Sequence, residues 1–265
     1  MAGWILSIIF LFLSLLYFFK LIKKFHPEID PYLLIFLLII FPNAFFLNAI
    51  YAESLFLFLS LASFYYALKK QFILAGIFGF FASLTRPTGI FLFVPLMWEY
   101  LKNYNFNLIR SLNLKILSIF FIPIGALSFF LYHYFKFGDF FLFFKVSSWW
   151  GRSFELNKEH FLFFSNPAIV NFCLDISFVI FILISIYFIF KKLRISYGLY
   201  ALTTLAVALS TGTFMSIERF ILVLFPIYIL GASIKNQYLQ QAWILISILF
   251  LAMNITLFVN NYWAG

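Results

Sequence analysis

The chain has 265 residues, of which 65% are hydrophobic and 10% charged, and its formal net charge is +9. A soluble domain is about half apolar and about a quarter charged, so this composition excludes a soluble fold. The apolar residues form long continuous runs, not the short alternating segments of a β-barrel, and they predict an all-α bundle of transmembrane helices. The basic residues lie in short clusters between these runs, as in cytoplasmic loops, which argues against nucleic acid as a partner.

The apolar runs predict one integral membrane domain over residues 1–265, with about ten spans, several of them short or re-entrant. A spanning helix needs about 20 apolar residues, or fewer where the bilayer is locally thinner. The first run has no basic segment before it and therefore indicates a membrane span, not a cleavable signal. The expected spans are 4–19, 32–48, 54–68, 72–86, 88–101, 115–135, 168–190, 196–213, 219–234 and 242–260.

Clusters of basic residues give the expected orientation. If every expected span crosses the membrane, all these clusters fall on one side, which the positive-inside rule assigns to the cytoplasm. Both termini and the outer ends of the spans then face outside, and we expect a prokaryotic cytoplasmic membrane. The clusters are Lys20, Lys23 and Lys24; Lys69 and Lys70; Lys102, Arg110 and Lys115; Lys191, Lys192 and Arg194; and Lys235.

The run 72–101 contains the dipeptide Arg86-Pro87 near its middle. Proline disfavours a helical conformation at the residue before it and begins a new segment. Two short crossings of about 21 Å each are therefore expected, at a rise of 1.5 Å per residue. The turn between them would lie below the outer surface, with Arg86 facing a water-filled recess because lipid does not tolerate irregular backbone.

The interval 136–167 is the longest polar stretch and is external on this topology. Trp149 and Trp150 suit a membrane interface, and the phenylalanine-rich stretch 140–144 is expected to lie on the membrane as an amphipathic segment.

Polar residues otherwise gather at the outer ends of the expected spans. A charged side chain at mid-bilayer costs roughly 3 kcal/mol, so such residues mark a polar cavity or a membrane surface. Arginine binds phosphate through two hydrogen bonds, and a lipid phosphate could reach such a site sideways from the membrane. The candidate site residues are Tyr51, Glu53, Arg86, Thr88, Asp139, Trp150, Arg152, Glu218 and Arg219.

Simpler interpretations of these residues stay open. Glu53 is also a favourable acid at the start of a helix, and Arg86 could extend to the surface. Asp139 follows Gly138 and suits a turn or a cap, while Glu218 and Arg219 could form an ordinary interface pair.

No motif indicates a cofactor. The three histidines, His26, His133 and His160, have no metal-ligand spacing. The single cysteine, Cys173, excludes a disulfide within the chain. Nucleotide-binding and serine-hydrolase motifs are absent from the sequence, so we expect no cofactor, and a requirement for a divalent metal stays open.

Five blocks, in the same order over nearly the whole chain, resemble the PIG-V-type mannosyltransferases, which are polytopic GT-C glycosyltransferases. The blocks are FPNAFFLNAIYAESLF, ASLTRPTGIFLFVPLMWEYL, FGDFFLFFKVSSWWGR, ERFILVLFPIYIL and the terminal NNYWAG.

This resemblance implies a GT-C-like fold and the transfer of a hexose, typically mannose, with inversion. The donor would be a polyprenyl- or dolichyl-phosphate sugar, and the acceptor a glycan or glycolipid on the outer side of the membrane. The family's motifs correspond here to Tyr51 and Glu53 in YAES, to Arg86 and Thr88 in RPTG, to Trp150 and Arg152 in WWGR, and to Arg219. Arg86, Arg152 and Arg219 are then expected to hold the donor phosphate, because fixed cations stabilise its growing charge.

The chain also departs from the family's pattern. Relatives begin with one more span and a large external loop whose Trp-Asp motif supplies the expected catalytic carboxylate, whereas this chain begins at what resembles their second span. Glu53 is the acid left at the membrane edge in the matching blocks, which makes it the candidate catalytic carboxylate. Alternatively, the reading frame starts upstream, or a second chain supplies the loop.

Two other classes of function remain. The chain could be a non-catalytic homologue, or one subunit of a split enzyme, that binds lipid-linked sugar. It could also be a lipid-linked glycan flippase or transporter, which predicts a polar path across the whole bilayer, not polar residues at one end.

Overall fold

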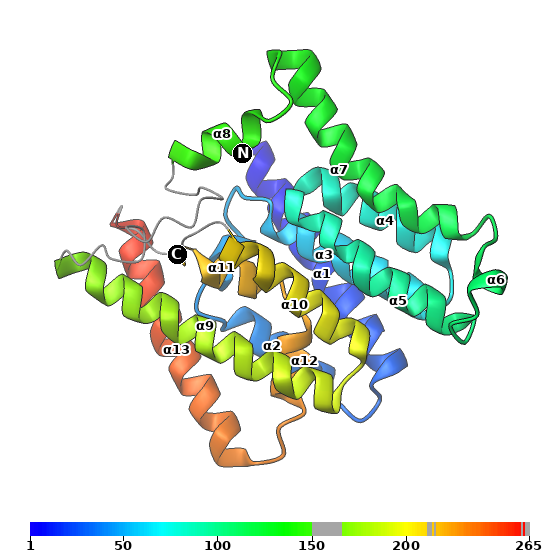
Figure 1. Cartoon of the computed structure of the whole chain (residues 1–265). Helices are drawn as coiled ribbons and strands as arrows, with labels where there is room; N and C mark the ends of the chain where they lie inside the picture. Colours follow the sequence, from blue (N-terminus) through cyan, green and yellow to red (C-terminus); the bar gives the residue numbers. More distant parts are fainter. Residues whose placement is uncertain (150–165, 211–213, 215, 261, 263–265) are drawn as a thin grey trace.

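The computed structural model describes residues 1–149, 166–210, 214, 216–260 and 262, except the side chains of 166–172. These residues form α- and 3-10 helices and no β-strand (Figure 1), as the composition predicts. Four helices contain a segment long and apolar enough to cross a membrane: α1 (Ala2–Phe25), α7 (Ile116–Phe137), α9 (Asn166–Lys192) and α13 (Gln237–Val259). The protein is therefore a helical membrane protein.

The remaining helices are shorter. Three of them, α3, α4 and α10, are apolar but have fewer than 18 residues, so the number of membrane crossings stays a prediction. The shorter helices are α2 (Pro31–Ile39), η1 (Ala44–Leu47), α3 (Glu53–Leu68), α4 (Phe72–Thr85), η2 (Pro87–Leu92), α5 (Phe93–Asn103), α6 (Leu108–Ser111), α8 (Leu142–Trp149), α10 (Ile195–Ser210), α11 (Ile217–Leu222) and α12 (Pro226–Ala232).

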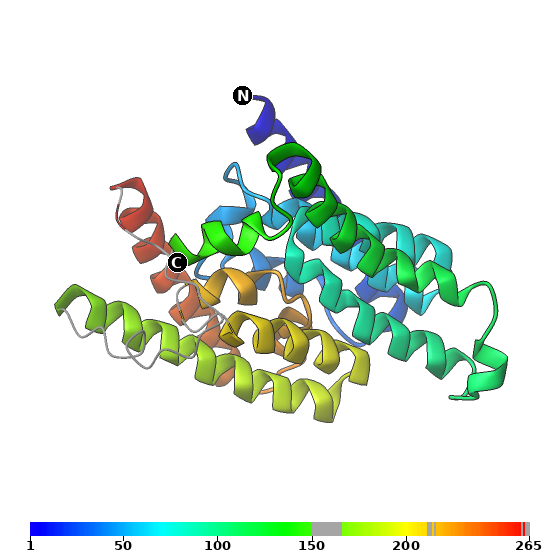
Figure 2. The ribbon, with the colours of Figure 1, turned by 45° about the horizontal axis from the view of Figure 1, so that its top comes forward.

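Four of the helices pack side by side in a row, and other helices form a second group beside this row. Helix α3 packs against α1 and α4, and α4 packs against α7, so these four helices are consecutive neighbours. In the second group, α10 contacts both α5 and α9, and α12 contacts α2, α9 and α10 (Figures 1 and 2). In the long helices α1, α7, α9 and α13, at most 28% of the residues of the spanning segment are buried, as expected where the surroundings are lipid.

Two of the expected spans are not continuous helices. In the expected span 32–48, α2 ends at Ile39, and a short irregular segment with Pro42 leads into η1. The expected span 219–234 is divided between α11 and α12, just before Pro226. The residues at both breaks are mostly buried within the protein. Irregular backbone is tolerated at membrane depth only where protein or a cavity surrounds it.

The predicted break at Arg86-Pro87 is confirmed. Helix α4 ends at Thr85, Arg86 is extended with φ −144° and ψ 136°, and Pro87 begins η2. The turn returns tightly against α4, because a Cβ atom at Gly89 would overlap the backbone of Ala82 and Ser83. Glycine is therefore required at this close approach of two backbone segments.

The phenylalanine-rich stretch 140–144 packs mainly against α7. The Phe130 ring on α7 stacks on Phe140 and Phe144, at centroid distances of 5.3 Å and 5.5 Å. Helix α8 therefore folds back toward α7, and Figure 1 shows it at the upper left, after the turn that follows α7. The Trp149 side chain at its end is 84% exposed, as an interface residue should be. The rest of the expected external loop, residues 150–165, lies outside the described part of the chain.

We predict that Gly76→Val destabilises the α4–α7 contact. A Cβ atom at Gly76 would overlap the carbonyl oxygen of Ser118 on α7, so the two helices would have to move apart. Overpacking of this kind typically costs about 1–3 kcal/mol of folding free energy. Thermal unfolding in detergent should show a lower midpoint for this variant than for Ala252→Val, which adds a similar group to an exposed position of α13. Equal midpoints would contradict the close packing of these helices.

Candidate functional site

Three charged side chains from distant parts of the chain meet in the structure. Glu53 is the first residue of α3, Arg86 follows the last residue of α4, and Arg219 lies in α11. Arg219 donates hydrogen bonds to Oε1 of Glu53 from Nε at 3.1 Å and from Nη2 at 2.5 Å. Arg86 donates to the same oxygen from Nη1 at 3.4 Å. The two guanidinium groups therefore share one carboxylate oxygen.

This cluster of Glu53, Arg86 and Arg219 is largely removed from solvent. The Glu53 side chain is 2% exposed, and those of Arg86 and Arg219 are 17% and 21% exposed. Two cations and one anion leave the cluster with one unit of positive charge. A buried charge is costly unless it is paired, so the cluster favours the binding of an anion beside the arginines.

Aromatic rings hold the planes of both guanidinium groups. The Arg219 guanidinium lies 4.4 Å from the ring centroid of Phe46 and 4.7 Å from that of Tyr51. The Arg86 guanidinium lies 5.5 Å from the Phe220 ring and 5.8 Å from the Phe56 ring. Cation–π contacts of this kind stabilise a cation in an apolar setting and restrict its orientation.

The backbone before α11 adopts an uncommon conformation. Ser216 is buried and has φ 62° and ψ 24°, in the left-handed region that serine seldom occupies. Such a residue costs about 1–3 kcal/mol and persists only where the surrounding structure enforces it. The bend lies three residues before Arg219 and sets the direction in which α11 begins.

A cavity of about 600 Å³ lies beside Arg86. Its polar lining comes mainly from the turn that carries Arg86, where Thr85 and Thr88 contribute, and from Ser147 and Ser210. Apolar side chains line the rest of it, including Phe220 of α11 and, from three other elements, Phe91, Phe129, Phe130, Phe143 and Phe144. The cavity thus combines one cationic wall with a mostly aromatic interior.

A second polar group consists of Asn254, Asn43 and Glu218. It adjoins the cluster in sequence, because Glu218 directly precedes Arg219. The Asn254 amide donates to Oδ1 of Asn43 at 2.5 Å, and Nδ2 of Asn43 donates to Oε2 of Glu218 at 2.8 Å. All three residues are buried. Glu218 is the residue before Arg219, yet its carboxylate joins this hydrogen-bonded chain and forms no ion pair with the described cations.

The structure brings together only part of the predicted set. Tyr51, Glu53, Arg86 and Arg219 meet in the cluster, and Thr88 lines the adjoining cavity. Trp150 and Arg152 lie outside the described residues, so their relation to the cluster stays a prediction.

Asp139 pairs with Lys145 and not with a member of the cluster. Its carboxylate lies 2.6 Å from the Lys145 ammonium group. This hydrogen bond lowers the pKa of Asp139, and the backbone amide of Phe141 acts in the same direction. The contact ties the α7–α8 connection to α8, which agrees with the turn-and-cap interpretation of this residue.

Sequence reasoning missed two groups. Asp175 in α9 interacts electrostatically with Glu218, and as a carboxylate within an apolar run it could have been found by the rule that singled out Glu53. The role of Asn254 had no such signal, because its partner Asn43 is 211 residues away in the sequence.

The chain matches no protein-family model, no curated protein and no solved structure. Among the described residues, no group of three or more His, Cys, Asp or Glu side chains is placed to hold a metal ion. The fold and the site therefore define a helical membrane protein with a buried arginine–glutamate cluster at the edge of an aromatic cavity.

We predict that Glu53→Gln destabilises the protein strongly. The neutral amide leaves two partly buried cations without their shared, buried counter-ion, and breaking a buried ion pair typically costs about 3–5 kcal/mol. Thermal unfolding in detergent would measure the loss. Glu28→Gln is the matched control, because the Glu28 side chain is 67% exposed. If both variants unfold at the temperature of the unmodified protein, the cluster does not stabilise the fold.

Proposed function

We propose that this membrane protein transfers a hexose, typically mannose, from a polyprenyl- or dolichyl-phosphate sugar to a glycan or glycolipid on the outer face of the membrane. The observation that carries the proposal is the sharing of the Glu53 carboxylate by Arg86 and Arg219 at the wall of an apolar cavity. The resemblance of the YAES, RPTG and ERF segments to those of PIG-V-type mannosyltransferases supports the same reaction.

The charge of the cluster suits a lipid phosphate. One unit of positive charge remains after Glu53 is counted, and each guanidinium offers further N–H donors in a planar arrangement that matches phosphate oxygens. Glu53 would hold both arginines in place before the donor binds, so less ordering is needed at the moment of binding. Arg152 is proposed as a third ligand of the same phosphate.

The cavity beside Arg86 suits the isoprenoid part of the donor. Phenylalanine side chains from η2, α7 and α8 line it, and they offer an apolar surface to a branched hydrocarbon chain. A donor that entered sideways from the membrane would place its chain among these rings and its phosphate at Arg86 and Arg219. Thr88 lies on the same wall as Arg86 and would contact the head group.

The reaction would proceed by a single displacement. The oxygen of an acceptor hydroxyl bonds to the anomeric carbon while the bond from that carbon to the phosphate oxygen breaks, with inversion. The bonding electron pair passes to the leaving phosphate, and the hydroxyl proton passes to a carboxylate. Cations fixed beside the leaving phosphate stabilise its growing charge, which is usually the largest single contribution to rate.

Glu53 is proposed to take part through one of its two oxygens. Oε1 accepts hydrogen bonds from both arginines, whereas Oε2 is buried and accepts none from the described residues. The free oxygen could receive the acceptor proton, while the other orients the donor site. A catalytic carboxylate contributed by a second chain, or by a segment upstream of Met1, is the alternative for that step.

The engagement of Glu53 also favours a second candidate function. One oxygen of its carboxylate, Oε1, already accepts hydrogen bonds from both arginines, so Glu53 serves to hold these side chains in place. The same site would then bind a lipid-linked sugar without transferring it, as in a non-catalytic homologue or one subunit of a split enzyme.

We predict that polyprenyl phosphate stabilises the purified protein more than the uncharged polyprenol does. A ligand that binds only the folded state at 100 times its Kd adds about 2.7 kcal/mol of stability, which a thermal shift in detergent would report. Arg219→Ala should remove the difference between the two lipids, whereas Arg110→Ala, which changes an exposed arginine on α6, should keep it. Equal stabilisation by both lipids in the unmodified protein would argue against a phosphate site.

We predict that Arg86→Ala lowers the transfer of radiolabelled mannose from polyprenyl phosphate mannose to a membrane acceptor by about 10²–10³-fold, the usual effect of removing one charge-stabilising donor. Arg110→Ala is again the control, and the amount of inserted protein is measured for each variant.

Full transfer by Arg86→Ala would remove this residue from the donor site. If the unmodified protein binds polyprenyl phosphate but forms no glycosidic bond, the non-catalytic candidate is favoured. Sugar delivered into sealed vesicles without a new glycosidic bond would instead indicate a transporter.

A further inference from the structure

The end of α3 that lies opposite Glu53 carries an excess of positive charge. Helix α3 begins at Glu53 and has 16 residues, so Lys69, which follows it, lies about 24 Å further along. Lys20, near the end of α1, lies at the same end of the bundle, because its helix contacts the last turns of α3 there. Neither ammonium group forms an ion pair with a described carboxylate.

Three tyrosine rings join the two lysines. The Tyr17 ring of α1 lies 5.7 Å from the Tyr65 ring and 6.1 Å from the Tyr66 ring of α3. The Lys20 ammonium lies 5.2 Å from the Tyr17 ring. The Lys69 ammonium lies 5.4 Å from the Tyr65 ring and 6.0 Å from the Tyr66 ring. Cation–π contacts thus hold both lysines against one group of rings, and these five residues are called the tyrosine–lysine cluster.

The hydroxyl groups of the cluster can donate one more hydrogen bond. The Oη atoms of Tyr17 and Tyr66 lie 3.1 Å apart and share one hydrogen bond. Each phenol has one O–H donor, so this bond uses one of the two hydrogens. Among the described residues, no acceptor is placed to take the other hydrogen. An anion beside the hydroxyl pair would accept it and would also meet the two ammonium groups.

Aromatic side chains continue from the cluster toward the middle of the bundle. Phe78 of α4 stacks on Tyr66 at 5.4 Å, with the ring planes 7° apart, and contacts Phe58 of α3 at 5.8 Å. Phe58 lies about two turns before Tyr66, on the side of Glu53. These rings are only partly buried, like those of the cluster. The surface is therefore amphiphilic, with cations and hydroxyl groups at one end and apolar rings beside them.

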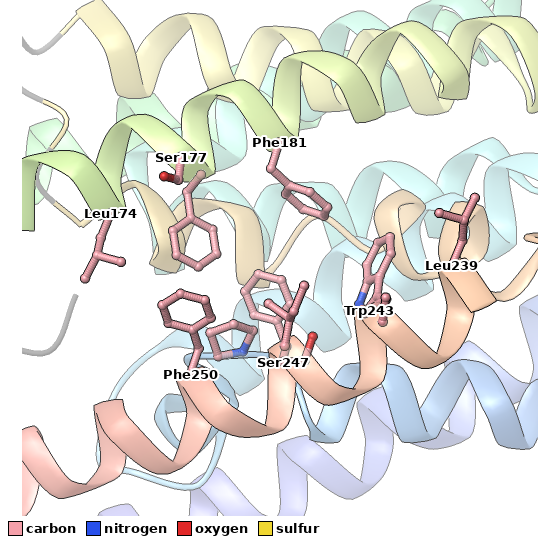
Figure 3. Close-up of a pocket in the computed structure, with 12 residues that line it drawn as sticks. Leu174, Ser177, Phe181, Leu239, Trp243, Ser247 and Phe250 are labelled. Atoms are coloured by element: carbon pink, nitrogen blue, oxygen red, sulfur yellow. The ribbon is translucent and has the colours of Figure 1, made fainter. Parts of the chain in front are cut away.

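The groove between α9 and α13 lacks this combination (Figure 3). It has a volume of about 370 Å³, and its walls are mainly apolar side chains, such as Leu174 and Phe181 on α9 and Trp243 and Phe250 on α13. Among the described residues that line it, two are serines and none is charged. A groove with this lining selects no particular head group, whereas the tyrosine–lysine cluster attracts an anionic one.

We propose that the tyrosine–lysine cluster binds the phosphate of an anionic phospholipid, with one acyl chain lying over Phe78 and Phe58. A lipid fits this place better than a soluble anion, because in α1 only 28% of the residues of the spanning segment are buried. The basic clusters predict that this end is cytoplasmic, where anionic lipids give the leaflet a negative potential. The proposal does not depend on the transfer reaction.

Native mass spectrometry of the purified protein in detergent tests the proposal. The protein is mixed with equal amounts of phosphatidylglycerol and phosphatidylcholine that carry the same acyl chains. We expect about tenfold more bound phosphatidylglycerol, a ratio that corresponds to about 1.4 kcal/mol. Lys20→Gln and Lys69→Gln should each lower this preference about fivefold, the usual contribution of one lysine near an anionic lipid surface. Tyr66→Phe keeps the ring but removes a hydroxyl group, and it should lower the preference too.

Two controls separate the cluster from other cations. Lys23 is an exposed lysine of the same helix, but its ammonium lies against Phe19, at 5.1 Å, and not against the tyrosines. Lys23→Gln removes the same charge and should keep the preference. Arg219→Ala should also keep it, because the arginine–glutamate cluster lies at the other end of α3.

Equal binding of the two lipids by the unmodified protein would overturn the proposal. So would an equal loss of preference in Lys23→Gln and Lys20→Gln, since this would indicate only the general charge of the surface. Displacement of the lipid by sn-glycerol 3-phosphate would assign the cluster to a soluble anion instead. A preference lost in Arg219→Ala but kept in Lys20→Gln would place the lipid at the arginine–glutamate cluster. No sugar donor is present, so none of these outcomes decides the proposed transfer.

Discussion

The oxygen Oε1 of Glu53 accepts hydrogen bonds from Arg86 and Arg219, and the arrangement of this end of the bundle depends on that contact. It joins the start of α3, the turn between α4 and η2, and the short helix α11. Buried charges are stable only when their partners are held in good geometry. The packing that places these three elements together is therefore also what makes an excess of positive charge tolerable in an apolar protein.

Interrupted helices allow this cluster to form inside the protein. Pro42, Pro87 and Pro226 each lie at a place where a helix is broken or restarted. Each break leaves some backbone outside a regular helix. At two of the breaks a polar side chain, Asn43 or Arg86, points into the protein. Membrane-depth backbone can be irregular only when other segments shield it from lipid, and the residues at the breaks after α2 and α11 are mostly buried within the protein.

Two apolar spaces flank the polar residues. The aromatic cavity adjoins Arg86, and the groove between α9 and α13 adjoins Pro42 and Asn254. Between them, Glu218 and Arg219 are adjacent in α11, but the first bonds to Asn43 and the second to Glu53. A single short helix thus contributes to both polar groups.

The sequence by itself determined what depends on composition and on neighbouring residues. Lipid as the main solvent follows from the apolar content, and the break at Arg86-Pro87 follows from the restriction that proline places on the residue before it. Glu53, Arg86 and Arg219 could be selected because a charge in an apolar run needs an explanation. Only the tertiary structure decided their partners: Glu53 and Arg219 are 166 residues apart, Asp139 pairs with Lys145, and Glu218 pairs with Asn43. The physical reason is that local rules act over a few residues, whereas these contacts depend on how distant helices pack.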